Sequence, residues 1–146
     1  MIRACRPVRL SALLGALALA ACAGEPGTTL YEQLGGETQI NAFVDDFSDR
    51  VKDNPRIARF FVESDMERFR TMLADFICEI SAGPCRYEGD AMPSVHLGLG
   101  INDAHFNALV EELIIAMEAH DVPVAAQNRL LAILAPMHPD IVDPPR

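Results

Sequence analysis

Apolar residues recur at helical spacing through most of the chain after Leu30. They fall three or four positions apart, which places them on one face of a helix. The stretches with this spacing lie within residues 40–51, 69–80, 106–117 and 124–137. No stretch of useful length alternates between apolar and polar residues with the period of two that a half-buried strand requires. The pattern therefore predicts an all-α domain.

The breaks between these stretches carry residues that begin or end helices. Gly35–Gly36 follows a short opening helix at "LYEQL", and Asn54–Pro55 interrupts the next helix. Asp65 is placed to cap a helix that begins near residue 66. Between residues 83 and 100, glycines and prolines leave room for little more than one helical turn. This loop-rich segment contains His96.

The first 22 residues differ from the rest of the chain. Three arginines and no acidic residue precede the uncharged run "LSALLGALALAA", an arrangement typical of an export signal. The run ends in "LAAC", which resembles the bacterial lipoprotein signal that is cleaved before a lipid-modified cysteine. Residues 1–22 are then a lipoprotein signal peptide with lipidation at Cys22, residues 23–29 a tether, and residues 30–143 the folded domain.

The alternative is an ordinary secretory signal that is cut near Ala23, and both readings predict an exported domain. On the lipoprotein reading we expect a periplasmic protein that contacts the membrane through its lipid anchor. Because Ala23 follows the cysteine, we expect sorting to the outer rather than the inner membrane.

Charge and motifs exclude several classes of function. The net charge of −9 disfavours a nucleic-acid partner, whose phosphates require a basic surface. The acidic residues fall mainly opposite the apolar stripes, which indicates solvated surface rather than a catalytic carboxylate pair. The chain also lacks the nucleophile elbow, the phosphate loop and the dinucleotide fingerprint.

Cys78 and Cys85 lie in the segment "ICEISAGPC". On one continuous helix they would be about 10.5 Å apart along the axis, which exceeds the ~7 Å limit on the Cα separation in a disulfide. Gly83–Pro84 can end the helix and let the chain fold back. A disulfide, which an oxidising compartment would favour, and two free thiols both remain open.

An ordered series of segments resembles the truncated haemoglobins, and within that family group I. It comprises "LYEQLGG", "FVDDFSDRV" (similar to helix B), "NPRIARFF" (the CD corner), "DMERFRTMLADFI" (helix E), "GPCRYEG", "MPSVHLGLGI" (the segment of the proximal histidine), and "HFNALVEEL" and "LLAILAPM" (helices G and H). The absence of tryptophan argues against groups II and III. The resemblance spans about residues 30–143 and implies a two-on-two helical sandwich that holds haem b.

The resemblance implies that His96 is the proximal haem ligand, with a neutral imidazole nitrogen bonded to iron. Such a ligand lies on a nearly uncoiled segment, which the flanking glycines suit. The residues alone leave a second reading open, in which His96 is a surface-loop histidine without a ligand. The other histidines, His105, His120 and His138, have no comparable context.

The distal side departs from the family pattern. Many group I members place a tyrosine where this chain has Ser48, directly after Phe47, and a distal glutamine where it has Leu73. The predicted distal pocket consists of Ser48, Phe69, Met72 and Leu73. Loss of hydrogen bonds to oxygen would cost about 1–3 kcal/mol. We therefore expect fast oxygen loss and easy autoxidation, with relatively better binding of CO or NO. Met72 adds a further possibility, a thioether as the sixth iron ligand.

Phenylalanine and methionine are frequent on the inner helix faces, as they are in an ordinary core and in a haem pocket. On the family pattern the haem-binding residues are His96, Phe47, Phe61, Phe69, Met72, Leu73, Phe76, Met92 and Val95. Candidates for contact with the haem propionates are Arg68, Arg70, Arg86 and Tyr87.

The resemblance implies a haem protein that binds oxygen, NO or CO. One alternative is a haem enzyme for NO detoxification, or an electron-transfer or sensor protein. NO turnover would require an electron donor, which the sequence does not identify. The other is a structural lipoprotein that has kept the fold without haem.

Overall fold

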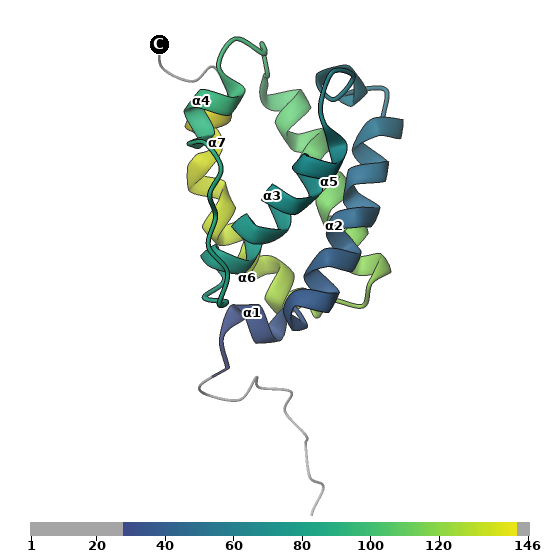
Figure 1. The fold of residues 1–146 in the computed structure, drawn as a ribbon. Coiled ribbons are helices and arrows are strands. Elements are labelled where there is room, and N and C mark those ends of the chain that lie inside the picture. Colours follow the sequence, from purple (N-terminus) through teal and green to yellow (C-terminus); the bar gives the residue numbers. More distant parts are fainter. Residues whose placement is uncertain (1–27, 143–146) are drawn as a thin grey trace, which may run out of the picture.

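The computed structural model describes residues 28–142, which form helices with no strand among them (Figure 1). The α-helices are α1 (Leu30–Gln33), α2 (Gly36–Asp53), α3 (Met66–Ile80), α4 (Met92–His96), α5 (Asp103–Ala119), α6 (Val124–Leu134) and α7 (His138–Ile141), with 3₁₀ turns η1 (Ala58–Phe60) and η2 (Ala135–Met137). The predicted all-α class is confirmed. The predicted signal peptide, Cys22 and most of the tether lie outside the described residues. Within residues 28–142, no helix is apolar over enough of its length to cross a membrane.

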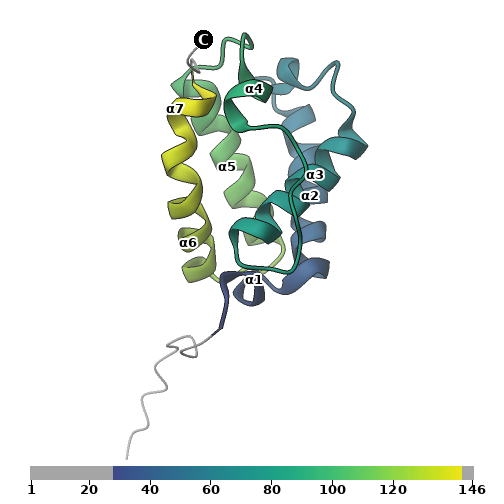
Figure 2. The same cartoon turned by 60° about the vertical axis from the view of Figure 1, so that its left-hand side comes forward.

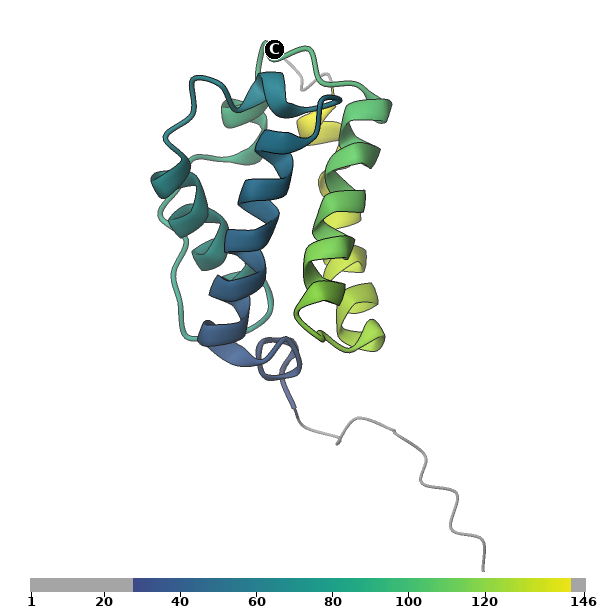
Figure 3. The same cartoon turned by 90° about the vertical axis from the view of Figure 1, so that its right-hand side faces the viewer.

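The long helices form two packed pairs. Helix α2 packs against α3 on one side and against α5 on the other. Helices α2 and α5 run side by side in Figure 3, and α5 runs beside α6 in Figure 2. Helices α2 and α3 therefore lie over α5 and α6, which is the predicted two-on-two sandwich. The short α4 lies outside this sandwich and packs against α7.

The core lies where the two pairs meet. The apolar stripe of α2 is buried, and Phe43 at its centre is fully inaccessible to solvent. Met117 of α5 and Leu130 of α6 are equally inaccessible. Burial of a side chain of this size contributes about 1.5–3 kcal/mol. The helical periodicity thus determines which face of each helix enters the core.

Side-chain caps begin helices α3 and α5, and the cap at Asp65 is the one that the sequence predicts. The Asp65 carboxylate accepts a hydrogen bond from the Arg68 backbone N–H (3.1 Å) at the start of α3. At the start of α5, the Asn102 side chain accepts a hydrogen bond from the backbone N–H of His105 (3.1 Å). Each cap satisfies a backbone donor that has no partner within its helix.

Helix α3 ends in a turn whose left-handed residue is Ala82 (φ 64°) rather than a glycine. The backbone N–H groups of Ala82 and Gly83 donate to the carbonyls of Glu79 (3.1 Å) and Cys78 (2.8 Å), which is the Schellman arrangement. The helix therefore ends slightly before the Gly83–Pro84 break that the sequence suggests. Beyond the turn, the chain folds back and Cys85 forms a disulfide with Cys78, with a Cα–Cα distance of 5.7 Å.

Candidate functional site

A cavity of about 400 Å³ separates α3 from the short helix α4. One part of its lining comes from α3, from the end of η1 and from the residues between them. The rest comes from α4 and from the segments directly before and after it. The apolar lining residues are Phe60, Phe61, Phe69, Met72, Leu73, Phe76, Met92, Val95, Leu99 and Ile101. The polar and charged ones are Ser64, Asp65, Arg68, Tyr87, Asp90 and His96.

His96 is half-buried at the end of α4 and lines this cavity. Its Nδ1 atom lies 2.8 Å from the Met92 carbonyl oxygen, one turn earlier. A carbonyl only accepts hydrogen bonds, so Nδ1 carries the proton and donates it. Nε2 then keeps its lone pair, and metal-ligating histidines are oriented by this kind of bond.

The surroundings of His96 limit what metal centre is possible. Among residues 28–142, no group of three or more His, Cys, Asp or Glu side chains is arranged to hold a metal ion. A metal at His96 would therefore take most of its ligands from a non-protein group. The cavity volume and apolar walls are in the range that suits a bound organic cofactor.

The short α4 is a consequence of its sequence. Pro93 lies in the first turn, where a proline is tolerated. After His96 the backbone turns away at Gly98 and Gly100, which have positive φ values of 79° and 67°. Glycine adopts this conformation without steric cost. His96 is thus presented by a single helical turn, as the family pattern implies.

The middle of the α3 wall is apolar, whereas Arg68 lies nearer the start of the helix. Phe69, Met72 and Leu73 all line the cavity. The Phe69 ring packs edge-on against Phe61, with a centroid distance of 5.3 Å. None of these side chains is a hydrogen-bond donor.

The structure places two residues of the predicted pocket elsewhere. Phe47 is 2% exposed and lies behind Phe69, with 6.3 Å between ring centroids, so it supports the wall without lining the cavity. Ser48 is fully buried and is not part of the lining. Its hydroxyl donates to the Val44 carbonyl (2.7 Å) of its own helix, so its proton is already engaged.

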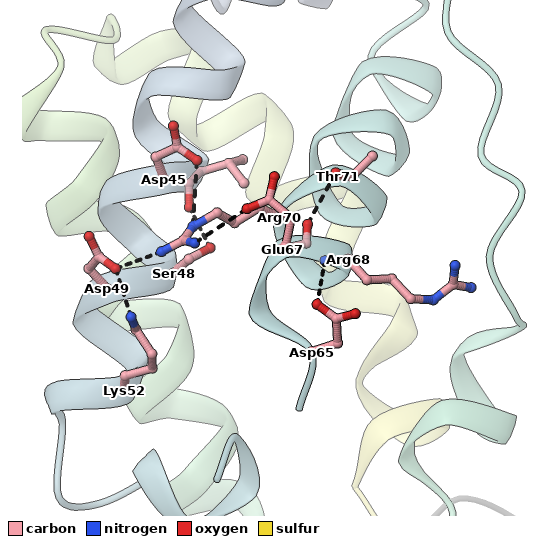
Figure 4. A network of polar contacts seen from close by, with 10 residues as sticks. Asp45, Ser48, Asp49, Lys52, Asp65, Glu67, Arg68, Arg70 and Thr71 are labelled. Carbon is pink, nitrogen blue, oxygen red and sulfur yellow. Dashed lines mark hydrogen bonds and ion pairs between the residues drawn. The ribbon is translucent and has the colours of Figure 1, made fainter. Parts of the chain in front are cut away.

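The candidates for propionate contact separate into two groups. Arg68 and Tyr87 line the cavity, whereas Arg70 and Arg86 do not. Arg70 points the other way, toward α2, with its guanidinium 2.7 Å from Asp49 and 3.6 Å from Asp45 (Figure 4). Positions 68 and 70 lie about 200° apart around the helix axis, so their side chains leave α3 on different sides.

The outward network around Arg70 also affects Asp49. Lys52 donates a hydrogen bond to the Asp49 carboxylate, with 3.0 Å between Nζ and Oδ1, and Arg70 adds a second cation. The hydrogen bond from Lys52 is the main reason that the pKa of Asp49 is lowered. This network is exposed and serves the contact between α2 and α3, not the cavity.

Tyr87 connects several parts of the cavity wall. Its hydroxyl donates to the Asp90 carbonyl (3.0 Å), and its ring packs edge-on against Phe76, with centroids 5.1 Å apart. Burial raises the pKa of the Tyr87 phenol, because desolvation disfavours the charged phenolate.

The predicted wall residues Phe61, Phe69, Met72, Leu73, Phe76, Met92 and Val95 all line the cavity together with His96. The sequence did not indicate the further lining residues Ser64, Asp65, Gly89, Asp90, Leu99 and Ile101. Leu99 and Ile101 follow His96 in a glycine-interrupted stretch without regular periodicity. No local signal marked their orientation.

A two-on-two helical sandwich that presents one oriented histidine to an apolar cavity is the architecture of a globin. The chain belongs to the bacterial-like globin family, whose family model matches residues 29–143.

Individual relatives agree with this assignment. The group 1 truncated haemoglobin of Synechocystis sp. is 34% identical over 116 residues, which cover 76% of this chain and 94% of the relative. That of Tetrahymena pyriformis is 30% identical over 114 residues, or 78% of this chain and 94% of the relative.

Solved structures show the same fold. The crystal structure of the T. pyriformis truncated haemoglobin in its Fe(III) form matches with a TM-score of 0.76 and 30% identity, over 79% of this chain and 98% of that one. The 2/2 haemoglobin from Synechococcus sp., in the cyanomet state with covalently attached haem, matches with a TM-score of 0.74 and 27% identity, over 80% and 99% of the two chains.

Proposed function

We propose that this haem-binding globin holds haem b in the cavity between α3 and α4, with Nε2 of His96 as the proximal iron ligand, and that it binds a diatomic gas. The observation that carries the proposal is the hydrogen bond from His96 Nδ1 to the Met92 carbonyl, which leaves Nε2 as the ligating atom. When bound, the haem supplies an iron centre that can take oxygen, NO or CO as a ligand.

The cavity-lining residues have complementary tasks. Phe61, Phe69 and Leu73 exclude water from the side opposite His96 and provide an apolar surface for a flat macrocycle. Arg68 lies in the same lining and supplies a cation for a propionate carboxylate. Because Phe69, Met72 and Leu73 donate no hydrogen bond, this part of the α3 wall favours NO and CO relative to oxygen, which gains more from a donor.

The test is a set of absorption spectra of the protein with added haem in the ferric, ferrous and CO-bound forms. We expect a sharp Soret band that is lost or strongly altered in His96→Ala. His120→Ala is the matched control, since His120 is outside the cavity lining. If the parent does not retain haem, or if His96→Ala has the parent's spectrum, the proposal is wrong.

Met72 favours electron transfer or sensing as a second candidate function. The cavity lining contains two thioethers; that of Met72 lies on α3, across the cavity from His96, whereas Met92 lies on α4 with His96 itself. If Met72 and His96 both held the haem iron, the thioether would raise its reduction potential. Met72→Leu, which nearly conserves volume, would then convert a six-coordinate ferrous spectrum to a five-coordinate one. An unchanged spectrum would exclude Met72 as a ligand.

NO detoxification on the same scaffold needs an external electron donor. NO consumption by the oxygenated protein in the presence of a chemical reductant measures this activity directly. Catalytic consumption, rather than a single turnover, would favour the enzyme over a carrier.

The proposal includes export and a lipid anchor at Cys22, supported by the "LAAC" segment. Helix α1, near the start of the described chain, lies at the opposite end of the domain from α4 (Figure 1). An anchor that precedes α1 would therefore leave the α4 end facing away from the membrane. Labelling of cells with a radioactive fatty acid tests this, because Cys22→Ser should abolish the label on the protein.

A further inference from the structure

A disulfide links the end of α3 to the segment that joins the two walls of the cavity. We propose that the Cys78–Cys85 disulfide positions the His96 side of the site, and that its reduction by a thiol accelerates haem loss. The inference rests on the proposed haem site and adds redox regulation to it. The relevant segment, residues 84–91, is called the strap below; it runs from the turn after α3 to the start of α4.

The disulfide is one of three ties between the strap and α3. The second is a hydrogen bond from the Tyr87 backbone N–H to the Glu79 carboxylate (3.0 Å), which is exposed to solvent. The third is the edge contact between the rings of Tyr87 and Phe76. The disulfide is the only covalent tie among them, and an exposed hydrogen bond contributes little on its own.

The end of α3 does not depend on the disulfide. Its last turn is closed by the backbone bonds from Ala82 and Gly83 to Glu79 and Cys78. Ser81 is buried, and its carbonyl accepts a hydrogen bond from the Tyr31 backbone N–H (2.8 Å). Reduction should therefore release the strap from Cys85 onward while α3 keeps its place.

The released strap is a wall of the cavity. Tyr87, Gly89 and Asp90 all line it. The Tyr87 ring lies so close over Gly89 that a Cβ there would be 2.2 Å from the phenolic oxygen. The Tyr87 hydroxyl then bonds Asp90, two residues before α4. A displacement of Cys85 is thus transmitted through Tyr87 to the helix that carries His96.

Reduction is an ordinary thiol–disulfide exchange. An external thiolate attacks one sulfur, forms a mixed disulfide and releases the other cysteine as a thiolate. A second external thiol then displaces the protein sulfur from the mixed disulfide. Two external thiols are thereby oxidised to one disulfide, and two electrons pass to the cysteines. Cys78 is 2% exposed, whereas Cys85 is half-buried. The accessible target is therefore the Cys85 sulfur, on the strap, and Cys78 stays in α3 as the leaving group.

The experiment measures the rate of haem transfer from the ferric protein to excess apomyoglobin, with and without dithiothreitol. The parent is compared with Cys78→Ala/Cys85→Ala, which is the permanently unlinked form. Leu130→Ala is the matched control, since it removes core packing in α6 away from the cavity lining. The iron–histidine stretching band of the ferrous protein reports separately on the His96 side.

We expect dithiothreitol to speed haem loss from the parent about tenfold, the lower end of what loss of support around a metal ligand costs. The double variant should lose haem at that faster rate without dithiothreitol and show no further change with it. The iron–histidine band should shift or broaden in both unlinked forms and stay unchanged in Leu130→Ala.

Two results would overturn the inference while the proposed function stands. One is a haem-loss rate and an iron–histidine band that do not change when the bond is reduced. The other is a Leu130→Ala variant that loses haem as fast as the unlinked forms at an equal fall in Tm, because the disulfide would then act only through global stability. If the parent holds no haem through His96, the proposed function itself fails, and this inference with it.

Discussion

Adjacent substitutions in the turn after α3 should change stability in opposite directions. Ala82 is held at φ 64°, in the left-handed region that costs a residue with a Cβ about 1–2 kcal/mol. Replacement by glycine removes this strain but adds about 0.4–1 kcal/mol of unfolded-state entropy. Ala82→Gly should therefore stabilise the protein by about 0.5–1 kcal/mol, or raise Tm by about 2–5 °C.

Gly83 is glycine for a different reason. A Cβ at this position would lie 2.6 Å from both the Cys78 sulfur and the Tyr31 ring, and 2.8 Å from the Cys78 carbonyl oxygen. The sulfur is held in the disulfide and the carbonyl belongs to the helix, so neither can move aside cheaply. Gly83→Ala should cost at least the usual overpacking penalty of about 1–3 kcal/mol.

Thermal unfolding followed by circular dichroism on the oxidised protein tests both changes. Asp121→Gly is a matched control, because Asp121 (φ 55°) occupies the same position in a similar turn after α5. Aspartate tolerates this conformation better than alanine, so its gain should be smaller. A lower Tm for Ala82→Gly, or an unchanged Tm for Gly83→Ala, would refute the reasoning.

Three further outcomes follow from the cavity. Leu73→Gln places a hydrogen-bond donor on the α3 wall and should slow oxygen release in stopped-flow measurements by about 5–150-fold, the equivalent of about 1–3 kcal/mol. The rate of CO release should change much less. Equal changes for both gases would contradict the hydrogen-bond explanation. Arg68→Gln should weaken haem retention in a haem-transfer assay while Arg70→Gln does not, since only Arg68 lines the cavity. Equal losses in the two variants would mean that the positive charge of α3, rather than contact between Arg68 and the haem, determines retention. In Tyr31→Phe, where Tyr87 is the remaining tyrosine, ¹³C NMR of the labelled ring should give a titration midpoint above the ordinary value of about 10. Because the folded state keeps the Tyr87 proton to a higher pH, the contribution of this group to stability is complete below about pH 10 and is lost as the pH rises through the raised pKa. A titration midpoint at or below about 10 would show that burial does not raise the pKa of the phenol.

The sequence by itself determined the helices and much of the site. Apolar residues at a spacing of three and four are a local signal, and so is a cap such as Asp65, because both act within a few residues. The series of family motifs identified His96 and most of the cavity wall. These predictions needed no knowledge of how distant segments pack.

Only the tertiary structure decided the details on which the chemistry depends. Ser48 follows Phe47 in the sequence, yet its hydroxyl is bonded to Val44 and it lies outside the cavity lining. Arg68 and Arg70 have the same side-chain chemistry, but only Arg68 lines the cavity, because its face of α3 is the one turned to α4. The sequence allowed either a disulfide or two free thiols at Cys78 and Cys85. In the folded chain the turn at Ala82 places the two Cα atoms 5.7 Å apart, and the disulfide forms. In each case the outcome depends on a direction or a distance across the packed helices, which neighbouring residues in the sequence do not specify.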